Sequence, residues 1–132
     1  MIKNYTCPKC DGQLRFGDHV FLTAYNMEGQ GSIILLHAEL GNYTVDFHPN
    51  IEFNKGEKVN FLCPICHKDL SSDKHEDLAM VCMTDSAGVK YDIYFSQVTG
   101  EHSTIKMYGE HVELIGPHSD RYMDYFSMSL LQ

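Results

Sequence analysis

Two Cys-Pro-x-Cys pairs constrain the fold of this chain more than any other feature. The first pair is Cys7 and Cys10, the second is Cys63 and Cys66, and a proline follows the first cysteine of each. Two cysteines three apart in a tight turn direct both sulfurs at one point, and the proline stiffens that turn. Four thiolates form the soft, tetrahedral ligand set of a structural Zn²⁺ site. We therefore expect one structural zinc ion per chain, bound by these four cysteines.

Such a closed site predicts a metal without predicting a reaction, because four protein ligands leave no position for water or substrate. A single Cys-x-x-Cys pair is also typical of a redox motif, and four thiolates also fit an iron centre of the rubredoxin kind. We favour zinc because the two pairs match and nothing in the sequence indicates electron transfer. Gly12 is expected to take the positive φ that such a turn often needs, although Lys68 stands at the matching place in the second pair.

The four cysteines resemble the ligands of zinc-ribbon proteins. The usual ribbon separates its two pairs by about 15–20 residues, whereas here residues 11–62 lie between them. Either a sizeable β insertion separates the knuckles, or the ribbon is built into a larger sheet. The resemblance implies a fold and a metal but no particular partner, because ribbon proteins serve in transcription, translation and enzyme scaffolding.

The rest of the sequence indicates a mostly β fold, with zinc-ribbon-type knuckles, antiparallel β-meanders and a short C-terminal helix. Strands are expected over residues 19–27, 32–40, 43–48, 58–62, 77–83, 89–97, 104–108 and 111–115. Gly41 and Asn42 are expected to form a two-residue hairpin turn. After Gly116 and Pro117, Ser119 or Asp120 is expected to cap a helix that runs to about residue 130.

A length of 132 residues suits a single zinc-stapled β domain. A shift of 56 residues carries Cys7 to Cys63 and Leu14 to Leu70, which divides the chain into two similar halves, about 1–56 and 57–132. This similarity indicates either an internal duplication or two like knuckles followed by ordinary strands. Both interpretations remain open at this point.

Charge and composition narrow the class of partner. The net charge is −8 and no run of Lys or Arg occurs, so nucleic acid is not the expected partner. No apolar run is long enough to predict a transmembrane helix, and the N-terminus lacks the apolar stretch of a signal peptide. Retained thiolate ligands indicate a reducing compartment. We therefore expect a cytoplasmic protein that does not contact a membrane.

The other candidates for chemistry are weaker. Cys82 lies in an apolar run and is expected to be a small buried hydrophobe, the alternative being a thiol that resolves oxidised knuckle cysteines. His67 follows Cys66 directly, but its place in the turn directs it away from a shared metal. The histidines at 102, 111 and 118 match no known metal-ligand spacing. No catalytic motif occurs, so an enzyme is the minority interpretation.

The expected function is that of a noncatalytic structural-zinc protein, acting as a protein–protein interaction or regulatory module. It binds a protein partner or self-associates through exposed strands or through the aromatic segment 122–128, unless that segment packs against the sheet. One alternative is a thiol/zinc redox sensor. Another is a nucleic-acid-binding zinc ribbon, in which aromatic side chains stack on bases.

Overall fold

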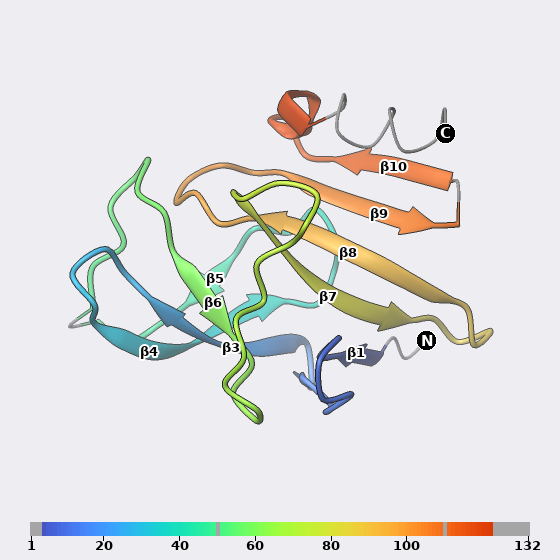
Figure 1. Ribbon diagram of the computed structural model, residues 1–132, viewed down its shortest axis with the longest axis horizontal. Helices are drawn as coiled ribbons and strands as arrows, with labels where there is room; N and C mark the ends of the chain where they lie inside the picture. The colour runs from blue at the N-terminus through green and yellow to red at the C-terminus, as the bar shows by residue number, and fades with distance from the viewer. Residues whose placement is uncertain (1–3, 50, 110, 123–132) are drawn as a thin grey trace.

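The protein consists of two antiparallel β-sheets and a single turn of 3₁₀ helix in the computed structural model, which describes residues 4–49, 51–109 and 111–122 (Figure 1). The first sheet has the strand order β1 (Asn4–Thr6), β7 (Leu78–Thr84), β8 (Lys90–Ser96), β9 (Thr104–Tyr108) and β10 (His111–Ile115). The second contains β2 (Arg15–Phe16), β3 (His19–Tyr25), β4 (Gly31–His37) and β5 (Val45–Asp46), with β6 (Asn60–Leu62) also paired to β3. The predicted mostly β fold class is confirmed.

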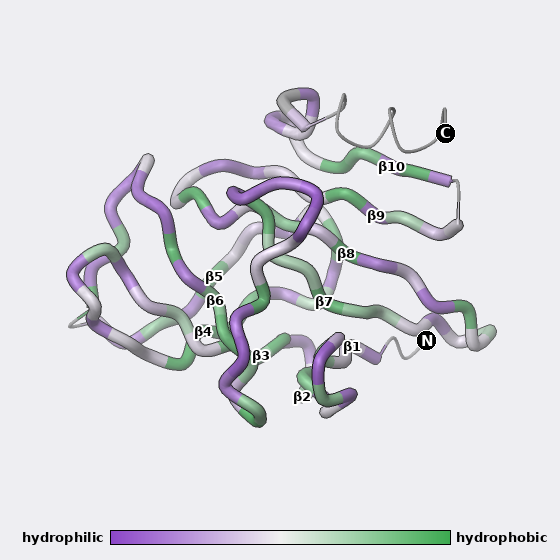
Figure 2. The backbone as a smooth tube through the Cα atoms, in the orientation of Figure 1, coloured by the Kyte–Doolittle hydropathy of each residue, from purple (hydrophilic) through white to green (hydrophobic). Residues whose placement is uncertain are grey.

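The main core lies between the two sheets. Alternate residues of a strand face the same side, and β3 and β7 both bury every second side chain. The inward-facing residues of these two strands belong to one hydrophobic cluster: Val20, Leu22, Ala24, Ala79, Val81 and Met83. The strand β7 is mostly hydrophobic, whereas the connection that precedes it is mostly hydrophilic (Figure 2). Burial of this inner face is what holds the sheets together.

Each short strand that precedes a cysteine pair joins the long strand of the other half. In the first sheet β1 pairs with β7, with Tyr5 opposite Met83. In the second sheet β6 pairs with β3, with Phe61 opposite Ala24. Both sheets therefore contain strands from both halves of the chain, and the two halves cannot separate without breaking each sheet.

The strands of the two halves follow the same order but are not related by one constant shift in sequence. The strands β1 and β6 begin at residues 4 and 60, a shift of 56. The strands β3 and β7 begin at 19 and 78, and β4 and β8 at 31 and 90, a shift of 59. The second half thus has three additional residues between its knuckle and its first long strand.

The predicted hairpin at Gly41 and Asn42 is wrong. The strand β4 ends at His37 and β5 begins at Val45, so a longer connection replaces the two-residue turn. Gly41 does adopt a positive φ of 91°. The chain leaves the sheet here because Tyr43 bonds to the other sheet: its hydroxyl lies 3.0 Å from Thr104 Oγ1 and donates to the Ile115 carbonyl at 3.2 Å.

The C-terminal part of the described chain packs on the outer face of the first sheet. Ser119–Tyr122 form a single 3₁₀ turn, and the rest of the predicted helix lies outside the described residues. Tyr122 is fully buried in a second cluster with Leu78, Tyr94 and Ile105, and its hydroxyl donates to a carboxylate oxygen of Glu101. In the part of the chain that is described, no helix has the length and apolar character needed to cross a membrane.

Candidate metal centre

The four cysteine sulfurs come together although the two pairs are far apart in sequence. The Sγ atoms of Cys7, Cys10, Cys63 and Cys66 all lie within 4.8 Å of one another. The Cys7–Cys66 and Cys10–Cys63 sulfur pairs are each 3.8 Å apart. A regular tetrahedron with Zn–S bonds of about 2.3 Å has sulfur–sulfur edges of about 3.8 Å, whereas a disulfide would require about 2.05 Å. All four are free thiols, and their geometry fits a tetrahedral metal ion.

The two knuckles have the same backbone shape. In the first, the Cys7 amide donates to the Gly12 carbonyl at 3.0 Å. In the second, the Cys63 amide donates to the Lys68 carbonyl, also at 3.0 Å. Because the same bond closes both loops, each pair of cysteines is presented in the same way to a shared ion.

The prediction of a positive φ at Gly12 is wrong. The residues with positive φ are Asp11 (61°) and His67 (63°), one position earlier in each knuckle; aspartate and histidine are among the non-glycine residues that tolerate this region best. Gly12 instead leaves space for its neighbours. A Cβ there would lie 2.6 Å from Ile65 Cδ1 and 3.2 Å from Cys10 Sγ. Glycine therefore allows the second knuckle to pack against the first.

Backbone amides surround the sulfurs. The amides of Lys9 and Ile65 each donate to the Sγ of the first cysteine in their own knuckle at 3.3 Å, and the Cys66 amide donates to Cys63 Sγ at 3.4 Å. A hydrogen bond from the Lys68 amide is the main cause that lowers the pKa of Cys66 to about 7. Such bonds favour thiolates, which are the metal-binding form of cysteine.

At Cys7, burial changes the pKa of the thiol in the opposite direction, upward. Its side chain is 1% exposed, and this burial raises the pKa of its thiol to about 12. Cys63 is fully buried as well, while Cys10 is exposed and Cys66 is half-buried. A buried thiolate requires a nearby cation, and a bound metal ion supplies that charge. The exposed side at Cys10 gives an ion a route into the site.

The remaining candidates lie outside the four-cysteine group. Cys82 is partly buried on β7, and burial raises the pKa of its thiol. His67 is exposed. The His102 ring stacks on Tyr43 with centroids 4.5 Å apart, and its amide donates to His118 Nδ1 at 2.8 Å. Among the described residues, the four cysteines are the one cluster of three or more side chains close enough to share a metal.

The left-handed conformation of His67 gives a testable energetic consequence. Replacing His67 by glycine is expected to stabilise the metal-loaded protein by about 1 kcal/mol, because glycine adopts positive φ without steric cost. The measurement is the free energy of unfolding from urea titration. The matched control, Lys68→Gly, should give no gain, because Lys68 does not have a positive φ. Equal gains from both variants would contradict this interpretation of the knuckle.

One further feature is not indicated by any sequence pattern: an open pocket of about 260 Å³ between the sheets. Its walls are formed by apolar residues on several strands, including Leu22, Ile34, Val81 and Ile93. In sequence these residues look like ordinary core positions.

Comparison with models of protein families, with curated proteins and with solved structures gives no match.

Proposed function

We propose that this chain is a noncatalytic structural-zinc protein, a single β domain in which Cys7, Cys10, Cys63 and Cys66 bind one Zn²⁺. The observation that carries the proposal is the 3.8 Å separation of two sulfur pairs within a group that spans no more than 4.8 Å. Zinc suits this group because it prefers tetrahedral thiolate sites. With all four positions taken by protein, the ion has a structural role.

The placement of the knuckles supports that role. The first cysteine pair follows β1, which belongs to the first sheet, and the second pair follows β6, which belongs to the second sheet. An ion shared by both pairs links the two sheets at one end of the core. Small β domains gain folding free energy from such a link. The burial of Cys7 and Cys63 supports this structural role.

We further propose that the protein works by binding another protein or a second copy of itself, in the reducing environment of the cytoplasm where thiolate ligands persist. Several large apolar side chains are exposed, and one of them, Ile65, lies within the second knuckle. Phe16, the last residue of β2, is 79% exposed. Exposed apolar side chains beside a rigid metal-bound loop favour a protein interface. The net charge of −8 is unfavourable for nucleic acid.

Native mass spectrometry of protein purified without chelator tests this proposal. We expect one zinc ion per chain, and a dimeric mass if the partner is a second copy. A folded, metal-free chain with five reduced thiols would contradict the zinc site. A metal-free chain with a lower mass, because its thiols have lost their hydrogens in forming disulfides, would favour the redox-sensor alternative.

A further inference from the structure

The four cysteines of the metal centre form an inner pair and an outer pair. The inner pair consists of the first cysteine of each knuckle, Cys7 and Cys63, which are 1% and 0% exposed. The outer pair consists of the second cysteine of each knuckle: Cys10 is exposed and Cys66 is half-buried. A reagent in solution therefore reaches Cys10 more readily than the other three cysteines of the site.

The backbone holds the inner sulfurs in their buried positions. The Lys9 amide donates to Cys7 Sγ at 3.3 Å. The amides of Ile65 and Cys66 donate to Cys63 Sγ at 3.3 Å and 3.4 Å. Because these donors belong to the closed knuckle loops, the inner sulfurs cannot turn outward without breaking hydrogen bonds.

An apolar side chain lies near the accessible sulfur. A Cβ at Gly12 would lie 2.6 Å from Ile65 Cδ1 and 3.2 Å from Cys10 Sγ, so both side chains are next to this glycine. Ile65 is itself 55% exposed. A reagent that approaches Cys10 thus meets an apolar surface as well as the sulfur, which favours a molecule with apolar parts.

Charge around Cys10 disfavours an anionic reagent. Lys9 and Asp11, the neighbours of Cys10 in sequence, are both exposed and carry opposite charges. Four thiolates around Zn²⁺ leave the centre itself with a net negative charge. This charge repels an anion, so the reagent that fits best is uncharged.

The thiolate is both the nucleophile and the metal-binding form of cysteine. A small molecule with an α,β-unsaturated carbonyl group reacts with a thiolate by addition. The Cys10 sulfur forms an S–C bond to the β-carbon, the π-electron pair of the C=C bond moves to the α-carbon, and that carbon takes a proton from water, which leaves hydroxide. The product at Cys10 is a neutral thioether, so one of the four thiolate ligands is lost.

We propose that Cys10 is the site at which small, uncharged α,β-unsaturated carbonyl compounds modify this protein, and that the modification releases the metal ion. The inference rests on the proposed zinc site. Cys10 belongs to the knuckle that follows β1, and the shared ion joins this knuckle to the one that follows β6. Loss of the Cys10 thiolate therefore removes the link between the two sheets, and the protein responds to reactive carbonyl compounds through its zinc centre.

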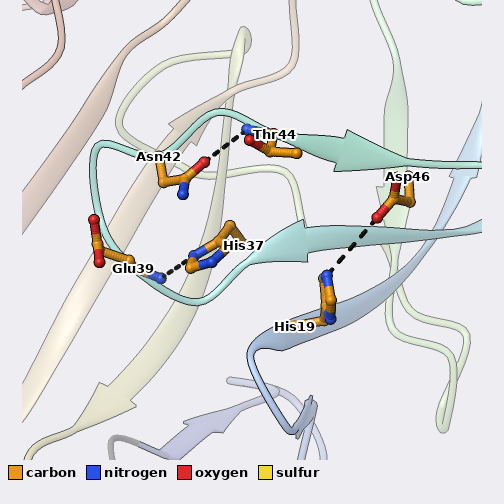
Figure 3. Close-up of polar contacts among 6 residues, drawn as sticks. All are labelled: His19, His37, Glu39, Asn42, Thr44 and Asp46. Atoms are coloured by element: carbon orange, nitrogen blue, oxygen red, sulfur yellow. Dashed lines mark hydrogen bonds and ion pairs between the residues drawn. The ribbon is translucent and has the colours of Figure 1, made fainter.

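Other nucleophilic side chains supply the controls. Cys82 is half-buried on β7 and lies outside the four-cysteine group. Two histidines lie near the start and the end of the β4–β5 connection (Figure 3): His19 Nε2 is 3.8 Å from Asp46 Oδ2, and His37 Nδ1 accepts a hydrogen bond from the Glu39 amide at 3.0 Å. One ring nitrogen of each histidine is thus engaged. Neither an adduct at Cys82 nor one at these histidines removes a zinc ligand.

The test treats the zinc-loaded full chain with less than one equivalent of N-ethylmaleimide, an uncharged compound of this class. We expect peptide mapping by mass spectrometry to find the first adduct within the site at Cys10, and a chromogenic chelator to detect zinc in proportion to that adduct. A first adduct at Cys7, Cys63 or Cys66 would overturn the proposal, as would an adduct at Cys10 that releases no zinc. A chain that holds no zinc before the reagent is added would overturn the proposed function as well.

Two comparisons test the specificity of the reaction. A maleimide that carries a carboxylate should modify Cys10 about fivefold more slowly at low ionic strength, because the thiolate centre repels it. Equal rates for the two maleimides would overturn the uncharged class of reagent. The matched control variant is His19→Gln, which should leave both the zinc content and the rate at Cys10 unchanged. Loss of the zinc signal in His19→Gln would show that the released zinc comes from the histidines, and would overturn the proposal.

Discussion

Replacing Cys63 by serine is expected to abolish zinc binding and to leave most of the chain unfolded at room temperature. Cys63 is fully buried, and its sulfur lies 3.8 Å from that of Cys10. Binding of structural zinc contributes about 10–16 kcal/mol to the folding of small zinc domains. That is as large as the whole net stability of a typical domain, about 5–15 kcal/mol. The measurements are bound zinc by elemental analysis and secondary structure by far-UV circular dichroism.

Cys82→Ser is the matched control, because it also changes a cysteine to serine but lies on β7 outside the four-sulfur group. It should retain one zinc ion per chain and lose no more than about 1–2 kcal/mol of stability, the usual range for a partly buried position. Chelation of the wild-type protein should reproduce the Cys63→Ser spectrum. If Cys63→Ser folds with the wild-type thermal midpoint, the metal does not hold the sheets together.

Removing residues 119–132 is expected to destabilise the protein by about 3–5 kcal/mol, the cost of deleting a large buried aromatic side chain. The effect comes from Tyr122, which is fully buried against Leu78, Tyr94 and Ile105. A shorter truncation that removes only residues 123–132 retains Tyr122 and should keep most of the stability. Urea unfolding of the two truncated proteins measures the difference.

The same pair of truncations separates folding from association. If residues 123–132 form a self-association surface, the shorter truncation should give a folded monomer where the full chain gives a dimer, as measured by analytical ultracentrifugation. A folded dimer in the shorter truncation would reject that surface. Equal stability of the two truncated proteins would contradict the role assigned to Tyr122.

Local sequence signals predicted the hairpins with tight turns well. Residues 104–108 and 111–115 alternate in character around a tight turn at Gly109, and the structure has strands over the same ranges. The connection after β4 was predicted less well, because its path depends on Tyr43 bonding to a residue 61 positions later. The exchange of β1 and β6 between the halves also involves contacts between distant parts of the chain. Neither the hydrophobic periodicity nor the composition of the turns shows which distant parts of the chain contact each other.

The four-cysteine cluster was predictable because two short motifs contain all of its cysteines. The residue with positive φ in each loop was not predictable from the motif, because Asp11 and His67 take this conformation only as the Cys7–Gly12 and Cys63–Lys68 hydrogen bonds close the loops. The cavity was not predictable for a different reason. It lies between two sheets, and a residue such as Val81 has the same pattern in sequence whether it faces a neighbour or an open pocket.

X-ray absorption at the zinc edge, on full-length protein purified without chelator, tests the central claim most directly. Four sulfur ligands at about 2.3 Å, with no nitrogen or oxygen neighbour, are expected for a closed site built from both knuckles. A site with two or three sulfurs completed by lighter atoms would contradict it, because the ion would then not be shared by Cys7, Cys10, Cys63 and Cys66.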